Sequence, residues 1–237
     1  MRTCACLSSL SGRCPILACQ ATSRSSLSIG SDQASGAVQG DPNTLDEAIA
    51  YVGEKEFPAI TGIPGCVGLS MLADRDTGRV IVSSAWADEQ SLKTSAEMVR
   101  PMQDRLMQML KADDALIQPW DIAVLHREQP SPADARAQVT WSRIAPDHMD
   151  TLLNAYRGSM LARLQTLPGF TSLSLVVDRK QGRIVSVTSF DSAATCEQTR
   201  KPARAFREEF ARAVGARIHD VAEMDVVVAH LHVPDNA

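Results

Sequence analysis

Two histidines occupy equivalent places near the ends of the two halves of the chain. His126 and His230 are 104 positions apart, and they follow the apolar stretches WDIAVL and MDVVVA. Imidazole titrates near neutral pH, so both side chains are candidates for acid or base groups in a pocket. The alternative is a hydrogen-bonded histidine at the rim of a sheet. His230 and His232 could share a metal ion, but the sequence offers no third ligand, so we expect no metal site.

A second set of candidates consists of aromatic side chains that could bind a flat, apolar molecule. Ligand pockets are lined mainly by apolar and aromatic groups. The chain has only three Trp, two Tyr and five Phe residues, so core packing could use all of them instead. The expected ligand-binding residues are Trp86, Trp141, Tyr156 and Phe190. No nucleotide-binding glycine loop, nucleophile elbow or HExxH zinc motif is present.

The composition limits the classes of partner. The net charge is −4, and basic and acidic residues are mixed along the chain without a basic stripe, so we expect no nucleic acid partner. No run approaches the roughly 18 apolar residues of a membrane helix, so we expect no membrane partner and a cytoplasmic protein. A small-molecule ligand remains the expected partner.

The first 31 residues contain many serines and no acidic residue, and they hold Cys4, Cys6, Cys14 and Cys19. This spacing indicates neither a disulfide framework nor a zinc knuckle. Polar residues interrupt the apolar run that a secretion signal needs. We therefore expect residues 1–32 to be a disordered leader.

The chain contains an internal repeat. Pro64–Arg79 and Pro168–Arg183 align without a gap at an offset of 104, and eight of the sixteen positions are identical. Apolar periodicity around this segment predicts strand, helix, hairpin, helix and strand in each copy. We place the first repeat at 33–128, a linker at 129–136 and the second repeat at 137–234.

This element order predicts the fold class. A βαββαβ unit forms an antiparallel sheet with both helices on one face, and it leaves the other face apolar and uncovered. A second copy in the same chain can cover that face. We therefore expect an α+β protein of two tandem ferredoxin-like repeats that form one intramolecular barrel, either as a monomeric pseudo-dimer or as a homodimer.

The repeated segments resemble a known family. GCVGLSMLADR, SAW, WDIAVLHR and DVAEMDVVVAHLHVP are similar to the antibiotic biosynthesis monooxygenase-like dimeric α/β barrels. They are most similar to an uncharacterised tandem-domain group from mycobacteria and related actinobacteria. The resemblance covers about residues 40–234. It implies the barrel fold and a family that includes oxygenases without cofactors, haem-degrading enzymes and members with no known reaction.

The resemblance also implies particular positions. Active relatives tend to carry tryptophan at the end of the third strand, which Trp86 matches, and histidine nine residues later, where this chain has Ser95. The second copy carries Phe190 and Thr199 at these two positions. A polar residue of the family's first strand falls near Trp141 or Ser142.

Two functions remain open after this comparison. One is a cofactor-independent monooxygenase that acts on a small aromatic or polyketide-like compound. The other is a non-catalytic barrel that binds a small ligand or has only a structural role. Haem degradation is disfavoured because the helix histidine is missing in both copies, and no cofactor is expected.

We further expect the two copies to differ in function, with any pocket in the first. Trp86 offers an indole N–H, whereas Phe190 has no donor. The second helix of the first copy carries flexible side chains, whereas the second copy carries bulky rings that would fill its cavity. These residues are Met102, Leu106 and Met109 in the first copy and Phe206 and Phe210 in the second.

Overall fold

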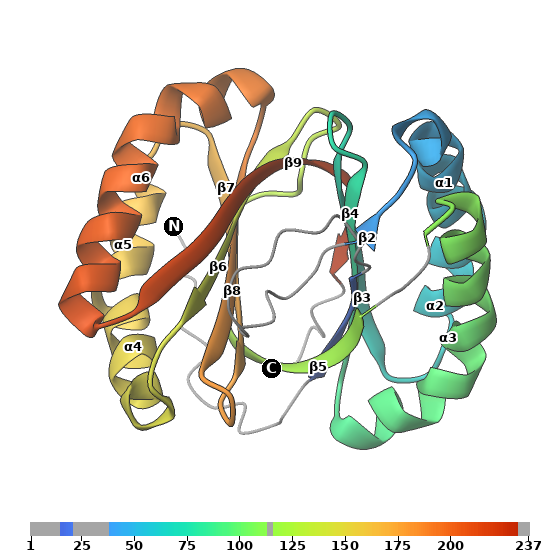
Figure 1. Cartoon of the computed structure of the whole chain (residues 1–237), viewed down its shortest axis with the longest axis horizontal. Helices are drawn as coiled ribbons and strands as arrows, with labels where there is room; N and C mark the ends of the chain where they lie inside the picture. Colours follow the sequence, from blue (N-terminus) through green and yellow to red (C-terminus); the bar gives the residue numbers. More distant parts are fainter. Residues whose placement is uncertain (1–14, 21–37, 113–115, 232–237) are drawn as a thin grey trace, which may run out of the picture.

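The computed structural model describes residues 15–20, 38–112 and 116–231, which form one sheet between two layers of helices (Figure 1). The first-half elements are β1 (Pro15–Gln20), β2 (Val38–Gln39), α1 (Leu45–Tyr51), α2 (Phe57–Thr61), β3 (Cys66–Asp74), β4 (Arg79–Trp86), α3 (Glu89–Met109) and β5 (Leu116–Arg127). The second-half elements are β6 (Arg136–Arg143), α4 (Met149–Ala155), α5 (Leu161–Gln165), β7 (Phe170–Asp178), β8 (Arg183–Phe190), α6 (Ala193–Val214) and β9 (Arg217–Leu231). No helix in these ranges has the length and apolarity that crossing a membrane requires.

The two halves repeat each other element by element. β3 and β7 begin and end 104 positions apart, as do β4 and β8, α1 and α4, and α2 and α5. A π-helical turn joins the two short helices in both halves, at Val52–Glu56 and at Tyr156–Met160. The predicted pair of tandem ferredoxin-like repeats is therefore confirmed.

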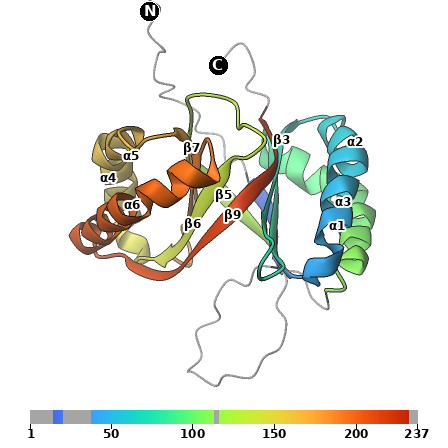
Figure 2. The same cartoon turned by 90° about the horizontal axis from the view of Figure 1, so that it is seen from above.

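The halves are joined by strand pairing as well as by packing. β5 pairs with β1 of its own half through Leu116–Asp121 and with β7 of the other half through Asp121–Arg127. β9 likewise pairs with β6 and then with β3. Both strands are long, with 12 and 15 residues, and they cross between the halves in Figure 2. The strands of both halves thus form one sheet that curls into the expected barrel.

Strand β1 corrects the expectation of a wholly disordered leader. Ile16 of β1 lies opposite Ala85 and Trp120, as Ala137 of β6 lies opposite Ser189 and Met224 in the second half. The short strand β2 takes the place of the end of β6. Val38 of β2 pairs with Val80, and the equivalent Ser142 of β6 pairs with Ile184. The opening strand of the first half is thus made from two separate segments. The rest of the expected leader lies outside the described residues.

Each face of the sheet has its own core. One cluster packs the sheet of the first half against α1, α2 and α3, and a second does the same in the other half. A third cluster fills the inside of the barrel and includes Leu72, Trp120, Trp141, Val176 and Met224. Alternate residues along each strand therefore belong to different cores, as the period of a β-strand requires.

The hairpin turns depend on glycine. Gly182 has a φ of 64°, and a Cβ atom there would overlap the carbonyl oxygen of Ile144. We predict that Gly182→Ala lowers the free energy of unfolding by about 2 kcal/mol, because strain and a steric clash combine. Gly158 is the matched control, since no atom lies within 4 Å of an added Cβ there. Urea unfolding measures both variants, and equal stabilities would contradict the prediction.

Candidate functional site

A buried carboxylate lies at the end of the π-helical turn of the first half. Glu56 is only 3% exposed, and its Oε1 atom has no hydrogen-bond partner in the described part of the chain. Burial raises the pKa of this carboxyl from its ordinary value of 4.5 to about 7. Burial, followed by the charge of Glu56, also raises the pKa of Tyr51. Buried polar groups normally have partners, so an unpaired carboxyl calls for an explanation.

Glu56 borders a small cavity between the sheet and the helices of the first half. The cavity has a volume of about 20 Å³, which is water-sized. The sheet contributes Leu69, Val82 and Ser84, and helix α3 contributes Val99, Met102, Gln103 and Leu106. Except for Glu56, Ser84 and Gln103, the wall is apolar. A proton acceptor therefore lies in surroundings that hold little water.

Trp86 supports this site from the end of β4. Its side chain is completely buried, and its indole N–H donates to Ser84 Oγ at 3.1 Å. Because Ser84 accepts the hydrogen bond of this N–H, Trp86 orients Ser84 at the cavity wall. Whether it also contacts a ligand, as expected from the sequence, remains a prediction. Ser95, at the family's histidine position, is buried and donates to the carbonyl of Leu92.

The second half fills the equivalent space with larger side chains. Met160 stands where the first half has Glu56, and Phe206 and Phe210 stand where it has Met102 and Leu106. The ring of Tyr156 meets that of Phe210 edge to face, with centroids 4.8 Å apart. Burial raises the pKa of Tyr156, whose side chain is hydrogen-bonded to Ser186. Tyr156 thus packs in the core of the second half.

Phe190 is also completely buried in this core. Thr199, at the second histidine position of the family, donates to the carbonyl of Cys196 at 3.0 Å. Neither half therefore presents an imidazole from its long helix. The expectation that haem ligation is disfavoured rests on these two residues.

A buried polar pair in the second half was missed by the sequence analysis. Gln138 on β6 is 2% exposed, and its Oε1 accepts a hydrogen bond of 2.7 Å from Arg207 Nη1. Burial lowers the pKa of Arg207. Gln138 is thus one buried polar residue of this strand, and Thr140 is another. Trp141, considered for that position, instead packs inside the barrel with the Arg79 guanidinium 4.1 Å from its ring centroid.

The two candidate histidines lie near the ends of β5 and β9, and His126 is not among the residues that border the cavity at Glu56. His126 Nε2 lies 3.2 Å from Gln165 Nε2 and 3.7 Å from Glu128 Oε1. Its side chain is partly exposed, and it borders a larger cavity inside the barrel. His230 of β9 pairs with Leu69 of β3, and His126 of β5 pairs in the same way with Leu173 of β7. The side chain of His230 lies outside the described residues.

Metal binding finds no support in the described ranges. They contain no group of three or more His, Cys, Asp or Glu side chains placed to hold a metal ion. Cys196 is buried, and burial raises the pKa of its thiol to about 11, so its thiolate form is disfavoured near neutral pH.

Comparison with known proteins gives the family. No family model matches the chain. The uncharacterized protein Rv2558 of Mycobacterium tuberculosis H37Rv is 40% identical over 199 residues, covering 84% of this chain and 84% of the relative. The uncharacterized protein Rv2557 is 36% identical over 198 residues, covering 84% of this chain and 88% of the relative. The chain belongs to the family of these mycobacterial proteins.

Solved structures confirm the expected fold. A "putative monooxygenase" from Lactobacillus acidophilus has a TM-score of 0.64 at 8% identity, covering 92% of this chain and 96% of that chain. An anthrone oxidase-like protein has a TM-score of 0.60 at 13% identity, covering 93% and 94%. The Rv2558 family therefore has the barrel fold of the antibiotic biosynthesis monooxygenase-like proteins. Identities this low concern the fold alone.

Proposed function

We propose that the first half is an oxygenase site without a cofactor, in which Glu56 is the general base. The substrate is a small aromatic or polyketide-like compound with an acidic C–H or phenolic O–H group. The observation that carries this proposal is the buried carboxyl of Glu56 at a cavity wall, whose Oε1 has no hydrogen-bond partner in the described part of the chain. The monooxygenase-like fold of the family supports the reaction class by analogy.

Glu56 is suited to the first step of such a reaction. A general base works best when its pKa lies near the working pH, and burial raises the pKa of Glu56 to about 7. The ionised carboxylate would accept a proton from the substrate and leave a delocalised carbanion or phenolate. The hydroxyl of Ser84, which accepts the indole N–H of Trp86, is in place to donate to an oxygen of that anion.

The second step needs only molecular oxygen. The substrate anion transfers electrons to O₂, a C–O bond forms, and the resulting peroxide takes back the proton held by Glu56. Loss of water from a C–H hydroperoxide leaves a carbonyl, so a methylene group and O₂ become a ketone and H₂O. The apolar wall of the cavity keeps bulk water away from the anion.

The cavity must enlarge to admit a ring. Its volume of about 20 Å³ is far below that of an aromatic substrate. Met102 borders it, and methionine is unbranched with three rotatable bonds, so this side chain can move aside at low cost. The second half carries the more rigid Phe206 at the equivalent position, which supports placing the reaction in the first half.

Oxygen uptake by the purified chain tests this proposal. The substrates are an anthrone and a 1,4-hydroquinone, with ¹⁸O₂ supplied to label the anthrone product. We expect catalysed uptake and one ¹⁸O atom in the anthraquinone carbonyl. Uptake no faster than the uncatalysed rate would favour the second candidate, a barrel that binds ligands without reaction. That candidate is supported by Ser95 and Thr199, which replace the histidines of active relatives.

A further inference from the structure

The inside of the barrel contains a cavity that the proposed oxygenase site does not use. It has a volume of about 150 Å³ and lies between strands of both halves. Ser70, Ser83, Ser174 and Ser189 contribute hydroxyl groups to its wall, and aliphatic side chains such as Val139 contribute the rest. Most of its wall lies on the opposite face of the sheet from Glu56, although Leu69 and Ser84 border both cavities.

The repeat explains why this space is open. Leu72 and Val176 are equivalent residues of β3 and β7, and both pack in the barrel core. Two positions before each of them, both copies carry serine, Ser70 and Ser174. The two serines therefore point into the barrel from opposite halves. Small side chains at these paired positions leave a space that large apolar residues fill elsewhere in the barrel.

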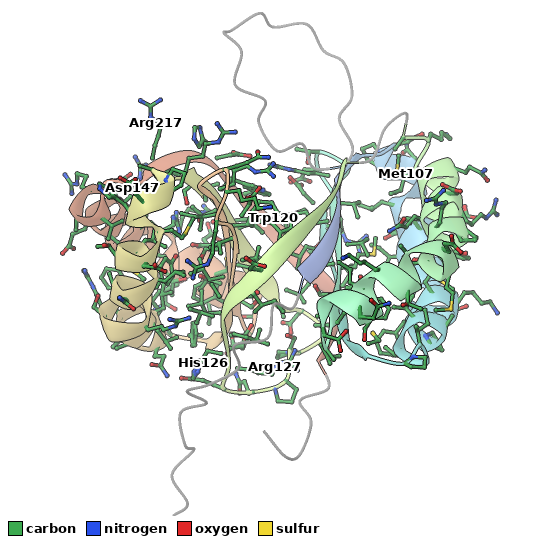
Figure 3. The ribbon with its side chains drawn as sticks, turned by 90° about the horizontal axis from the view of Figure 1, so that it is seen from below. Met107, Trp120, His126, Arg127, Asp147 and Arg217 are labelled. Carbon is green, nitrogen blue, oxygen red and sulfur yellow. The ribbon has the colours of Figure 1, made fainter. Side chains whose placement is uncertain are left out.

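Ionisable side chains border this cavity at one end. Among the residues that border the cavity, the titratable ones are His126 and Arg127, at the end of β5. Figure 3 shows both at one end of the barrel, with Trp120 further inside between the two halves. Away from that end, a charge placed among the serine and aliphatic side chains would lose its hydration without gaining a counter-charge. The interior therefore suits a neutral molecule.

Trp120 gives this wall a hydrogen-bond donor. Its side chain is 2% exposed, and its indole nitrogen has no partner in the described part of the chain. The guanidinium carbon of Arg183 lies 5.2 Å from the centroid of its ring. A buried N–H without a partner loses free energy that a ligand oxygen would restore.

The size of the cavity limits the ligand to one ring. A cavity of about 150 Å³ lined by aliphatic side chains is large enough for benzene. Benzene alone would leave the Trp120 N–H without a partner. A phenol has the same ring and an oxygen that can accept from Trp120 and donate to a serine. We propose that the barrel interior is a binding site for a neutral, single-ring phenol, separate from the site at Glu56.

Calorimetric titration of the whole chain with phenol and with benzene tests this proposal. We expect phenol to bind with a dissociation constant in roughly the millimolar range and benzene to bind more weakly. Trp120→Phe keeps the ring and removes the N–H, so phenol should bind about 3- to 10-fold more weakly, whereas benzene binding should not change. Ser174→Leu fills the cavity and should abolish binding of both.

Two further variants keep the experiment decisive. Ser83→Val introduces the residue that the second half carries at the equivalent position, Val187, so it should fold normally while weakening phenol binding. Glu56→Gln is measured beside it, because the proposed oxygenase site also takes phenolic compounds and this variant reports any phenol bound there. The proposal would be overturned if the unmodified chain did not bind phenol. It would also be overturned if the folded variants Ser83→Val and Trp120→Phe bound phenol as tightly as the unmodified chain does. Loss of phenol binding in Glu56→Gln would place the ligand in the other cavity and overturn it as well.

Discussion

Glu56→Gln is expected to lower kcat for oxygen uptake by at least about 100-fold, because a general base contributes roughly 10²- to 10⁴-fold. The substitution preserves the shape of the side chain and removes the proton acceptor. Stopped-flow or oxygen-electrode kinetics with the anthrone substrate measure the effect. Glu54→Gln is the matched control, since Glu54 is exposed on the same π-helical turn and should retain full activity.

The pH dependence adds a second readout to this experiment. Only the ionised carboxylate accepts a proton, so kcat should rise with pH through about 7, where the pKa of Glu56 lies. The residual kcat of Glu56→Gln should not show this rise with pH. A Glu56→Gln enzyme with full activity and an unchanged pH profile would exclude Glu56 as the base.

Glu56→Met is expected to stabilise the protein by about 3 kcal/mol at pH 8. The pKa of Glu56 is raised from 4.5 to about 7, and each unit corresponds to about 1.4 kcal/mol. Methionine is the residue of the second half at this position, where Met160 is 1% exposed in the core. The gain comes from removing a buried charge that has no partner.

The sign of the pH effect follows from linkage. Below about pH 4.5 the carboxyl is protonated in both the folded and the unfolded chain, so it contributes no pH dependence there. Between about 4.5 and 7 the unfolded chain ionises first, so the stability of the natural protein falls as the pH rises. Above about 7 the penalty is constant.

Urea unfolding at pH 4 and at pH 8 measures this difference for the natural protein, Glu56→Met and Glu54→Gln. The stability difference between the natural protein and Glu56→Met should be larger at pH 8 by about 3 kcal/mol. Glu54→Gln should behave like the natural protein. A Glu56→Met variant less stable than the natural protein at both pH values would mean that Glu56 has partners that hold its charge.

According to these two predictions, Glu56 lowers the stability of the protein and is required for its activity. Glu56→Met also removes the base, yet it is expected to strengthen the fold, because a buried charge without a partner is kept only where it has a use. The second half, with Met160 and two phenylalanines, shows the packing that the fold adopts without that use.

The sequence predicted the repeated elements because each has a local signal. Apolar periodicity and the turn glycines Gly78 and Gly182 define the hairpins and helices in both copies, and the structure confirms them. The joining of the halves through β5 and β9 has no such signal. The sequences of these strands are apolar on both faces, and this pattern does not indicate which strands they pair with. Strand β1 was missed for a similar reason, because a short segment in a polar leader becomes a strand only through tertiary pairing.

Glu56 was missed because a charged side chain is expected at the surface. It lies four residues from both Val52 and Ile60, so helical spacing places it on the face of these core residues, but its charge argues against burial. One signal could have revealed it. The offset of 104 places Glu56 opposite Met160, which belongs to the apolar stripe of the second copy. The roles assigned to His126, His230 and the aromatic residues remain predictions, because packing and binding require the same residue types.

The most direct test of the central claim is the titration of Glu56 itself. Carbon-13 NMR of the glutamate side-chain carboxyls follows each group from pH 3 to pH 9, and comparison with Glu56→Gln identifies the signal of Glu56. The unpaired and buried carboxyl should titrate with a midpoint of about 7. A midpoint near the ordinary value of 4.5 would show that Glu56 is solvated or paired in solution, and it would contradict the account of the site given above.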